Sequence, residues 1–402
     1  MLSMTTRRTQ VGIVGAGPSG LLLSHLLARQ GIDSIVVENR GRDYVEERVR
    51  AGVLEQGTID TLAEAGLGER MMAEGLFHDG IEIRFDGQAH RIDFPSLTGG
   101  KRIMVYGQNE VVKDLIDARL EAGGAIVFDV DDTAIEGIDG ESPTIRYGKD
   151  GAEHAIACDY IAGCDGFHGI CRPSIPEAAL TGYDRVYPFA WLGVLADSTP
   201  PSREVAYCHS ERGFALLSLR SPTVSRLYIQ VAPDEDIANW PDQRFWDELQ
   251  RRTAVEDAAP IETGPILHKG ITPMRSFVVE PMRHGRLFLA GDAAHIVPPT
   301  GAKGMNLAVA DIRFLTEALA AFYRTGDTAG LDGYSARALR RVWKAQRFSW
   351  WMTTMLHLSP NDSPFDRRRQ RAELDYVTGS EAAMRTLAEN YVGLPFETGL
   401  AP

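Results

Sequence analysis

Residues 10–38 read QVGIVGAGPSGLLLSHLLARQGIDSIVVE. The apolar residues 10–14 predict a short strand, and residues 15–20 carry the pattern G-x-G-x-x-G. The leucine-rich run that follows predicts a helix with a thick apolar face, which ends at the next glycine. Residues 35–37 predict a second strand, and Glu38 stands at its end. This order of strand, glycine loop, helix, strand and acid predicts a βαβ unit that binds a dinucleotide.

The glycines and the acid have separate chemical roles in such a unit. Gly15, Gly17 and Gly20 let backbone N–H groups approach a pyrophosphate at the helix N-terminus, and we assign Ser19 to the same site. Glu38 follows the first glycine by about 20 residues, the distance at which an acid accepts hydrogen bonds from a ribose. Its negative charge would repel a 2′-phosphate, so the adenosine held here belongs to FAD or NAD rather than NADP.

A second cofactor segment lies far along the chain. Residues 286–290 predict a strand, which runs into Gly291-Asp292 and, after further glycines that include Gly304, into an apolar helix over residues 307–319. A carboxylate beside a tight turn suits a ribityl chain, and a helix that begins near Gly304 directs its positive end at a flat ligand. A nicotinamide dehydrogenase does not need this second site. An FAD that lies extended across the protein does need it.

The composition excludes several other classes of protein. Hydrophobic residues make up 44% of the chain and the formal net charge is −13, which argues against disorder, nucleic acid and anionic membranes as partners. No apolar run approaches the length of a membrane span. The four cysteines form no C-x-x-C pair, no histidine cluster completes a metal site, and we therefore expect no metal and a cytoplasmic location.

Several blocks together carry a resemblance to a known family. The segment 158–166 predicts a strand that ends in Asp165-Gly166. Added to the two cofactor segments, it resembles the single-component flavoprotein aromatic hydroxylases. Some blocks resemble in particular those members that hydroxylate 4-hydroxybenzoate; these blocks are residues 48–57, 106–108, 163–169, 291–306, 348–352 and 389–395. The resemblance runs from about residue 9 to residue 395.

We expect an α/β fold. Strand-like runs between residues 177 and 270 interrupt a βα pattern, and they predict an inserted mixed β-sheet substrate domain. A Rossmann-like FAD-binding domain is expected in two parts, residues 1–176 and 271–345, and a helical C-terminal segment over residues 346–402.

The resemblance implies an activity. It is the hydroxylation of 4-hydroxybenzoate to 3,4-dihydroxybenzoate with O2, through a flavin hydroperoxide, with FAD as cofactor and NADH or NADPH as co-substrate. It also implies a homodimer. Two alternatives are a hydroxylase of the same fold that acts on another aromatic acid, and a flavin redox sensor without turnover.

A predicted hairpin carries the expected substrate pocket. Strand alternation puts Ser218 and Arg220 on one face. If Ser221 pairs with Ser225, Arg220 lies opposite Arg226 and Ser218 lies opposite Tyr228. Two facing arginines are unfavourable unless an anion offsets them. This pattern indicates a carboxylate pocket, although a solvated sheet face is the alternative.

The resemblance then assigns roles to residues on both sides of the substrate. Ser218, Arg220 and Tyr228 match the residues that hold the substrate carboxylate, and Arg226 matches an arginine near the flavin. Pro299 and Thr300 border the substrate ring. The implied proton relay consists of Tyr207, Tyr391 and His78, in which Tyr207 contacts the phenol oxygen. A relay is needed because an unperturbed phenol has a pKa near 10 and must lose its proton around neutrality.

The remaining assignments concern FAD and the electron donor. The implied FAD residues, in addition to the glycine loop, are Arg48, Arg50, Gln108, Asp165, Arg226, Asp292, Gly304 and Asn306. The residues assigned to the nicotinamide donor are Asn39, Arg40, Tyr44 and Arg50. An arginine common in NADPH users is replaced by Asn39, and Glu46 and Glu47 add negative charge, so we expect NADH to be preferred.

Overall fold

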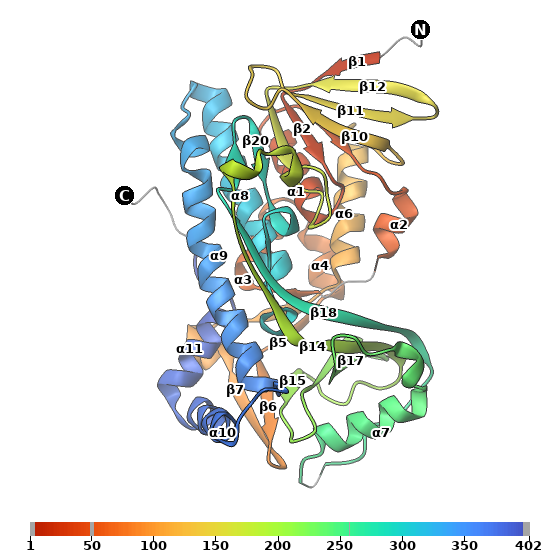
Figure 1. Ribbon diagram of the computed structural model, residues 1–402, viewed down its shortest axis with the longest axis vertical. Coiled ribbons are helices and arrows are strands. Elements are labelled where there is room, and N and C mark those ends of the chain that lie inside the picture. Colours follow the sequence, from red (N-terminus) through yellow and green to blue (C-terminus); the bar gives the residue numbers. More distant parts are fainter. Residues whose placement is uncertain (1–4, 49–51, 257, 397–402) are drawn as a thin grey trace.

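The computed structural model describes residues 5–48, 52–256 and 258–396. Arg50, which the resemblance assigns to both FAD and the nicotinamide donor, lies outside these ranges. Figure 1 shows an upper part built on the N-terminal βαβ unit and a lower part built on a large sheet. Two long strands, β14 (Thr181–Asp197) and β18 (Ile266–Glu280), pair with each other and connect the two parts.

The expected βαβ unit forms the centre of a six-stranded sheet within the described residues. In spatial order its strands are β19 (Arg283–His284), β20 (Leu287–Leu289), β13 (Tyr160–Gly163), β2 (Val11–Val14), β3 (Ser34–Val37) and β9 (Ala125–Val127). All neighbouring pairs except β19–β20 are parallel. The strands from both expected cofactor segments and from the Asp-Gly segment are therefore neighbours, and their carboxyl ends lie at one edge of the sheet.

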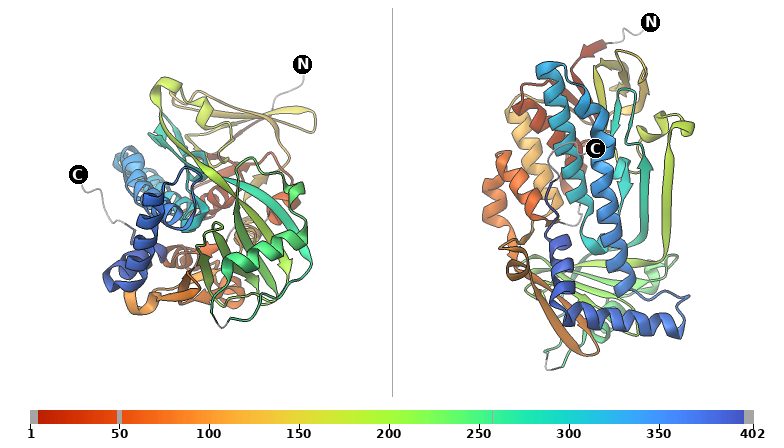
Figure 2. Two further views of the ribbon diagram at one scale, coloured as in Figure 1. Left: turned by 60° about the horizontal axis from the view of Figure 1, so that its bottom comes forward. Right: turned by 90° about the vertical axis from the view of Figure 1, so that its left-hand side faces the viewer.

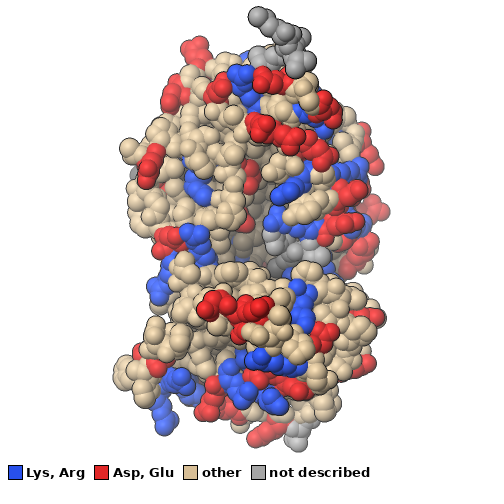
Figure 3. All heavy atoms as spheres, turned by 45° about the vertical axis from the view of Figure 1, so that its right-hand side comes forward, with Lys and Arg blue, Asp and Glu red and all other residues tan. Residues whose placement is uncertain are grey.

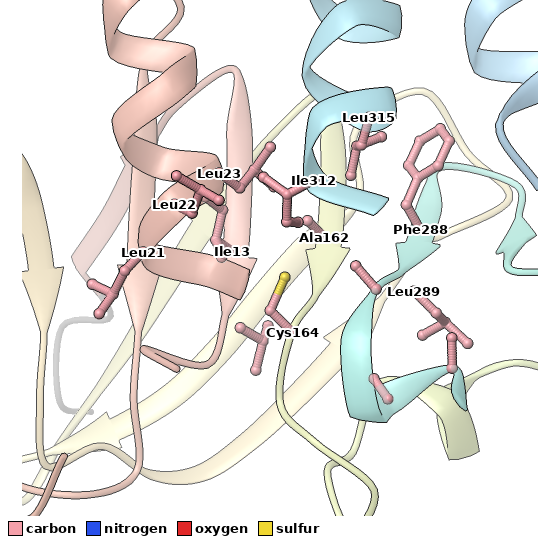
Figure 4. Close-up of a cluster of buried hydrophobic side chains, with 14 of the residues drawn as sticks. Ile13, Leu21, Leu22, Leu23, Ala162, Cys164, Phe288, Leu289, Ile312 and Leu315 are labelled. Carbon is pink, nitrogen blue, oxygen red and sulfur yellow. The ribbon is translucent and has the colours of Figure 1, made fainter. Parts of the chain in front are cut away.

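The sheet is held by helices that share one core with it. These helices are α1 (Pro18–Arg29), α6 (Gln108–Glu121) and α8 (Gly304–Thr325). Leu21 and Leu23 of α1 are fully buried, as are Ile13 of the sheet and Ile312 of α8. Figure 4 shows their side chains meeting beside those of β13 and β20. Parallel strands buried on both faces read as continuous apolar runs, which is why the sequence identified them.

The large sheet has eight strands in the described part of the chain. Their order is β21 (His295–Ile296), β18, β14, β17 (Val224–Val231), β16 (Ala215–Ser221), β15 (Val205–Cys208), β6 (Gly80–Phe85) and β7 (Gln88–Asp93). Parallel pairing of β15 with β6 makes the sheet mixed. One apolar cluster packs this sheet against the C-terminal helices, and a second packs its other face against α7 (Asp242–Thr253). Both faces of its central strands are therefore buried.

The other elements complete the two parts. The smaller sheets contain β1 (Thr5–Arg8), β12 (Ala152–Ala157), β11 (Thr144–Lys149) and β10 (Asp131–Glu136), and β4 (Val53–Leu54), β8 (Ile103–Val105) and β5 (Leu76–His78). The remaining α-helices are α2 (Arg42–Glu47), α3 (Gln56–Glu64), α4 (Gly68–Glu74), α5 (Phe94–Thr98), α9 (Ala329–Leu356), α10 (Pro364–Gly379) and α11 (Glu381–Tyr391). The 3-10 helices are η1 (Arg172–Ser174), η2 (Glu177–Ala179), η3 (Ile237–Asn239), η4 (Gly291–Ala293) and η5 (Pro299–Gly301).

The expected fold class is confirmed: the protein is α/β, with a mixed sheet and a helical C-terminus. Figure 2 shows α9 running from the upper part of the molecule into the lower part, with α10 and α11 beside the large sheet. The domain boundaries remain a prediction, since the large sheet combines the segment 177–270 with β6 and β7 from earlier in the chain. Among the described residues, no helix is both long and apolar enough to cross a membrane.

The expected register of the β16–β17 hairpin is wrong by two residues. Ser218 pairs with Arg226, Leu216 pairs with Tyr228, and an irregularity near Arg220 separates this register from that of the turn. The turn is shorter than expected, because Val224 already belongs to β17 and pairs with Ser221. A slip of two residues keeps each side chain on its face of the sheet. The polar residues therefore still share a face, but Arg220 and Arg226 are not directly opposite.

Candidate active site

The glycine loop after β2 has the geometry of a phosphate cradle. Gly15 has a φ of +105°, and a Cβ there would lie 2.3 Å from the carbonyl oxygen of Cys164, so only glycine fits. At Gly17, by contrast, a Cβ would find nothing within 4 Å, and the loop is open on that side. Glu38 receives the backbone N–H of Ala16 at 2.7 Å, which fixes its carboxylate beside the loop.

The second cofactor segment lies next to the first. A Cβ at Gly291 would lie 2.6 Å from the Ser19 hydroxyl, so the turn of η4 packs directly on the start of α1. Asp292 is exposed on this turn, and there is open space at Gly304 where α8 begins. Asp311 of α8 supports the turn from inside, since its carboxylate accepts the Gly291 N–H at 2.9 Å.

The residues present fit FAD. Asp165 follows β13, and its Oδ1 is buried without a hydrogen-bond partner among the described residues, while its Oδ2 accepts the Cys171 N–H. An orphaned buried carboxylate oxygen indicates that a ligand or water completes the site. Gln108 begins α6 and Arg48 is exposed after α2. Open glycine loops, an acid for the ribose and a helix N-terminus together suit an extended dinucleotide.

The side chain of Asn306, which the resemblance assigns to FAD, makes its hydrogen bonds within the protein. Its Oδ1 accepts the Glu55 N–H, and its Nδ2 donates to the carbonyl oxygens of Val53 and Ala302. These three bonds satisfy most of the amide and tie β4 to the start of α8. A role of Asn306 toward the cofactor would therefore go through its backbone N–H in the first turn of α8.

One face of the large sheet gathers most of the expected substrate residues. Residues directly opposite in neighbouring strands point to the same side. Tyr207 lies opposite Leu216, Leu216 lies opposite Tyr228, and Ser218 follows two residues along the same strand. Gly193 lies opposite Tyr228, and a Cβ there would lie 2.7 Å from its ring. Because Gly193 has no side chain, the Tyr228 ring can lie directly over its backbone on this face.

Tyr207 and Tyr391 form the hydrogen bond that the resemblance implies. Their hydroxyl oxygens are 2.6 Å apart, and both side chains are buried, with exposed fractions of 2% and 1%. The Tyr207 hydroxyl also donates to the carbonyl oxygen of Thr300 at 2.9 Å. Burial raises the pKa of both phenols above the ordinary value, so both are protonated at neutral pH.

The turn of η5 is set by α9. The Thr353 hydroxyl donates to the hydroxyl of Thr300 at 2.9 Å, and a Cβ at Gly301 would lie 2.7 Å from the hydroxyl of Ser349. Close packing on α9 therefore fixes where Pro299 and the carbonyl of Thr300 lie. It also explains why the C-terminal helices, which are remote in sequence, belong to the site.

His78 ends β5 and is 2% exposed. Neither ring nitrogen has a hydrogen-bond partner among the described residues, and burial lowers its pKa, against the opposing charges of Glu204 and Asp79. Phe94 connects this region with the tyrosines: its backbone N–H donates to the backbone carbonyl of Asp79, and its ring stacks on the Tyr391 ring with the centroids 5.3 Å apart. Among the described residues no hydrogen bond joins His78 to Tyr391, so the role of His78 in the relay stays a prediction.

The two arginines of the hairpin have different partners. Nε of Arg226 donates to the Tyr228 hydroxyl. The guanidinium of Arg220 instead contacts Asn109 at the start of α6, and burial, followed by the charge of Arg226, lowers its pKa. A half-buried cation beside a second cation is unfavourable, and a bound anion would offset the cost.

Sequence reasoning missed a buried ion pair beneath Tyr391. The Lys303 ammonium donates to Glu55 at 2.6 Å and to the Tyr391 carbonyl at 3.1 Å, and it lies 5.7 Å from the centre of the Tyr391 ring. Arg341 holds the other oxygen of Glu55. Burial lowers the pKa of Lys303, and Glu55 opposes this. The sequence offered one indication of this ion pair: Lys303 lies between two glycines of the second cofactor segment.

The helix assigned to the nicotinamide donor is short and exposed. Within α2, Arg42 pairs with Glu46 and, at 2.8 Å, with Asp117 of α6. The guanidinium groups of Arg40 and Arg48 lie 5.3 Å and 5.9 Å from the centre of the Tyr44 ring. Figure 3 shows the surface hollowed between the upper and lower parts of the molecule.

Comparison with known proteins shows the family of the chain. Residues 8–349 match the family model described as FAD binding domain. The p-hydroxybenzoate hydroxylase of Acinetobacter baylyi is 52% identical over 98% of this chain and 97% of its own. A 3-(3-hydroxy-phenyl)propionate/3-hydroxycinnamic acid hydroxylase of Mycobacterium avium is 28% identical over 82% of this chain and 58% of its own. The crystal structure of p-nitrophenol 4-monooxygenase from Pseudomonas putida has a TM-score of 0.82 at 20% identity, covering 98% of this chain and all of the other, which shows a shared fold.

The fold and the matched relatives define the class of protein: this is an FAD-dependent aromatic hydroxylase, and therefore an enzyme. Its cofactor is FAD, with reduced nicotinamide as co-substrate. The chain belongs to the FAD binding domain family, and its 52% identity to a p-hydroxybenzoate hydroxylase makes it a relative of that enzyme.

Proposed function

We propose that the chain hydroxylates 4-hydroxybenzoate to 3,4-dihydroxybenzoate, with O2 and a reduced nicotinamide. The hydrogen bond between the Tyr207 and Tyr391 hydroxyls carries this proposal, because it places a proton path at one end of a face that also holds Ser218 and Tyr228. A substrate with a phenol at one end and a carboxylate at the other fits such a face. The 52% identity to p-hydroxybenzoate hydroxylase supports the same substrate.

The loops after β2, β13 and β20 hold the cofactor. Gly15, Gly17, Ser19 and Gly20 cradle the pyrophosphate, Glu38 binds the ribose, and Asp292 binds the ribityl chain. When bound, FAD supplies two-electron transfer from the nicotinamide and the activation of O2. The residues of this chain orient the substrate, move its proton and exclude water.

The carboxylate end of the substrate is held by the hairpin. Arg220 offers a planar fork for two hydrogen bonds, and Ser218 and Tyr228 add hydroxyl donors. Arg226 donates to the Tyr228 hydroxyl, which leaves the Tyr228 proton free to point at the substrate. A charge-assisted grip at this end fixes which ring carbon faces the cofactor.

The phenol end is held by the tyrosine pair. Tyr207 accepts the phenol proton as it passes its own to Tyr391, and His78 receives the proton at the far end of the path. Because the pKa of His78 is lowered, its imidazole is neutral at pH 7 and can accept a proton. A phenolate donates electrons to the ring and makes the neighbouring carbon nucleophilic. Pro299 and Thr300 border the ring, and the apolar cluster around Tyr391 keeps water out.

Three further assignments complete the proposal. NADH is the preferred donor, because the charge of Arg42 is already neutralised by Glu46 and Asp117 and would attract a 2′-phosphate only weakly. The enzyme is cytoplasmic, in keeping with four buried free cysteines. The active form is a homodimer, as the family resemblance implies, and sedimentation of the FAD-loaded protein tests this.

Substrate selection by the FAD-loaded enzyme tests the proposed function. Oxidation of reduced nicotinamide is followed with 4-hydroxybenzoate, with uncharged 4-hydroxybenzamide and with 3-(3-hydroxyphenyl)propionate. We expect strong stimulation by 4-hydroxybenzoate alone. Stimulation that is equal with the uncharged amide would exclude the carboxylate pocket, and stronger stimulation by the propionate would identify a hydroxylase of another aromatic acid.

A further inference from the structure

The Arg220 guanidinium lies on the N-terminus of α6. A Cβ at Gly107, the residue before this helix, would lie 2.1 Å, 2.4 Å and 2.5 Å from three guanidinium atoms. The planar group therefore rests on the bare backbone of Gly107. Its Nη2 donates a hydrogen bond to Oδ1 of Asn109, the second residue of α6. Within the described part of the chain, no other hydrogen bond to this guanidinium is present.

The orientation of the Asn109 amide is fixed from the other side. Its Nδ2 donates to Oε1 of Glu110 at 2.7 Å, so its oxygen must be the end that faces Arg220. Glu110 is in turn held by Lys113 at 3.2 Å and by Arg70. Both cations form ion pairs with Glu110, although Arg70 also pairs with Glu74 and Asp114, and the charge of Glu110 partly opposes the lowering of the Arg220 pKa. The group in direct contact with Arg220 is the uncharged amide of Asn109.

We propose that Asn109 is a positioning residue for substrate binding: it orients the Arg220 fork toward the substrate carboxylate without neutralising the charge of Arg220. This inference rests on the proposed function. A guanidinium has five N–H donors, and Asn109 takes one, which leaves enough for a bidentate carboxylate. An aspartate in the same place would also orient the arginine, but it would satisfy the charge that the substrate needs.

The energetic reason is preorganisation. An arginine side chain has several rotatable bonds and loses rotamer freedom when it binds. Asn109 and the Gly107 backbone restrict the guanidinium before the substrate arrives. Removal of the amide oxygen leaves a half-buried cation without a hydrogen-bond acceptor, and its fork then samples other positions.

The test uses Asn109→Ala and Asn109→Asp, both as purified FAD-loaded enzyme. Dissociation constants for 4-hydroxybenzoate and for 4-hydroxybenzamide are measured from the change in the flavin absorption spectrum. We expect the alanine variant to bind 4-hydroxybenzoate about fivefold more weakly, and the aspartate variant to lose at least as much. Binding of the uncharged amide should change by less than about twofold in both. In steady-state assays KM should rise more than kcat falls.

Two further variants complete the test. Gly107→Ala has an ordinary backbone conformation to occupy, since φ is −59°, and the three atoms nearest to its methyl group all belong to the Arg220 guanidinium. This variant should also lose affinity for 4-hydroxybenzoate but not for the uncharged amide. It replaces the Asn109 variants in the test if those fold poorly. Asn361→Ala removes an exposed asparagine in the turn before α10 and is the matched control, with unchanged constants expected.

Several results would overturn the inference. They are unchanged binding in Asn109→Ala, tighter binding of 4-hydroxybenzoate, which would make Asn109 a competitor of the carboxylate, and an equal loss for the uncharged amide. Failure of the proposed function is a separate result, because the wild-type enzyme itself would then bind the amide as tightly as 4-hydroxybenzoate.

Discussion

The Tyr207 hydroxyl has a single proton and two acceptors within hydrogen-bond distance, the Thr300 carbonyl and the Tyr391 hydroxyl. While Tyr207 donates to Thr300, Tyr391 must donate to Tyr207. This second bond reverses only when both O–H groups turn, so that Tyr207 donates to Tyr391 and Tyr391 donates onward. In the proposed relay, Tyr207 then takes the phenol proton of the substrate as it gives its own proton to Tyr391. Because burial raises the pKa of both tyrosines, an isolated tyrosinate is unfavourable here, and we expect the proton to move along the pair in concert.

Substitution Tyr391→Phe removes the second member of this pair with little change in volume. We expect FAD binding to be retained, hydroxylation to slow about tenfold or more, and more peroxide to form per nicotinamide oxidised. The bound phenol would keep its proton at neutral pH. Product, peroxide and nicotinamide are measured together across a pH series. If coupling and pH profile match those of the wild type, Tyr391 has no part in the mechanism.

Substitution Arg220→Lys keeps the charge and removes the fork. We expect the dissociation constant of 4-hydroxybenzoate to rise about tenfold or more, since a point charge cannot make the same pair of charged hydrogen bonds. FAD content should be unchanged. Spectral titration measures both quantities, and a rise below twofold would disprove the assignment of Arg220 to the carboxylate.

At the scale of the element, the β16–β17 hairpin separates what the sequence can predict from what it cannot. Period-two alternation predicts which side chains share a face, and Ser218 and Tyr228 do share one. The pairing register depends on the turn, and a local irregularity near Arg220 changed it. Sequence patterns do not encode such an irregularity, so the facing pair Arg220 and Arg226 did not form.

The cofactor loops were predictable because their signals are local. Gly15 needs a positive φ and a close neighbour, and both requirements are visible in the glycine pattern. The contacts of Lys303 with Glu55 and of Arg220 with Asn109 join segments far apart in the chain. A lone lysine or asparagine has no periodicity, so only the folded structure reveals these pairs.

We propose that the short helix α2 determines the choice of electron donor. Arg42 is paired with Glu46 and with Asp117, so two carboxylates share one cation, and Glu47 adds a further negative charge on the same helix. We expect kcat/KM to be about fivefold higher for NADH than for NADPH, which corresponds to roughly 1 kcal/mol of repulsion. Initial rates at equal low concentrations of each donor measure the ratio. A clearly higher value for NADPH would mean that Arg40 outweighs the glutamates.

At the scale of the whole molecule, the large sheet and the C-terminal helices share one apolar cluster that contains both tyrosines of the proposed relay. His357, just after α9, lies inside it: Trp191 donates to its Nε2 at 2.7 Å, and it stacks on Phe189 and Phe214. Burial lowers the pKa of His357 to about 3. The packing that forms the site therefore keeps this histidine neutral.

This lowered pKa predicts loss of stability in acid. The unfolded chain binds a proton at His357 near pH 6.5, whereas the folded chain does not until about pH 3. The contribution of neutral His357 to the free energy of unfolding is thus fully present above pH 6.5, and it is lost as the pH drops below that value. Between pH 7 and pH 5 the wild type should lose about 2 kcal/mol more than His357→Gln, which cannot titrate. Urea unfolding at fixed excess FAD measures this, and parallel losses in the two proteins would refute it.

The central claim is that this site hydroxylates 4-hydroxybenzoate at the carbon next to its phenol. The most direct measurement is the product of turnover by FAD-loaded enzyme with 4-hydroxybenzoate, O2 and NADH, separated by chromatography and compared with the nicotinamide consumed. The account predicts 3,4-dihydroxybenzoate in nearly equal amount to the nicotinamide oxidised, with little peroxide. Peroxide alone, or hydroxylation at a different ring position, would contradict it.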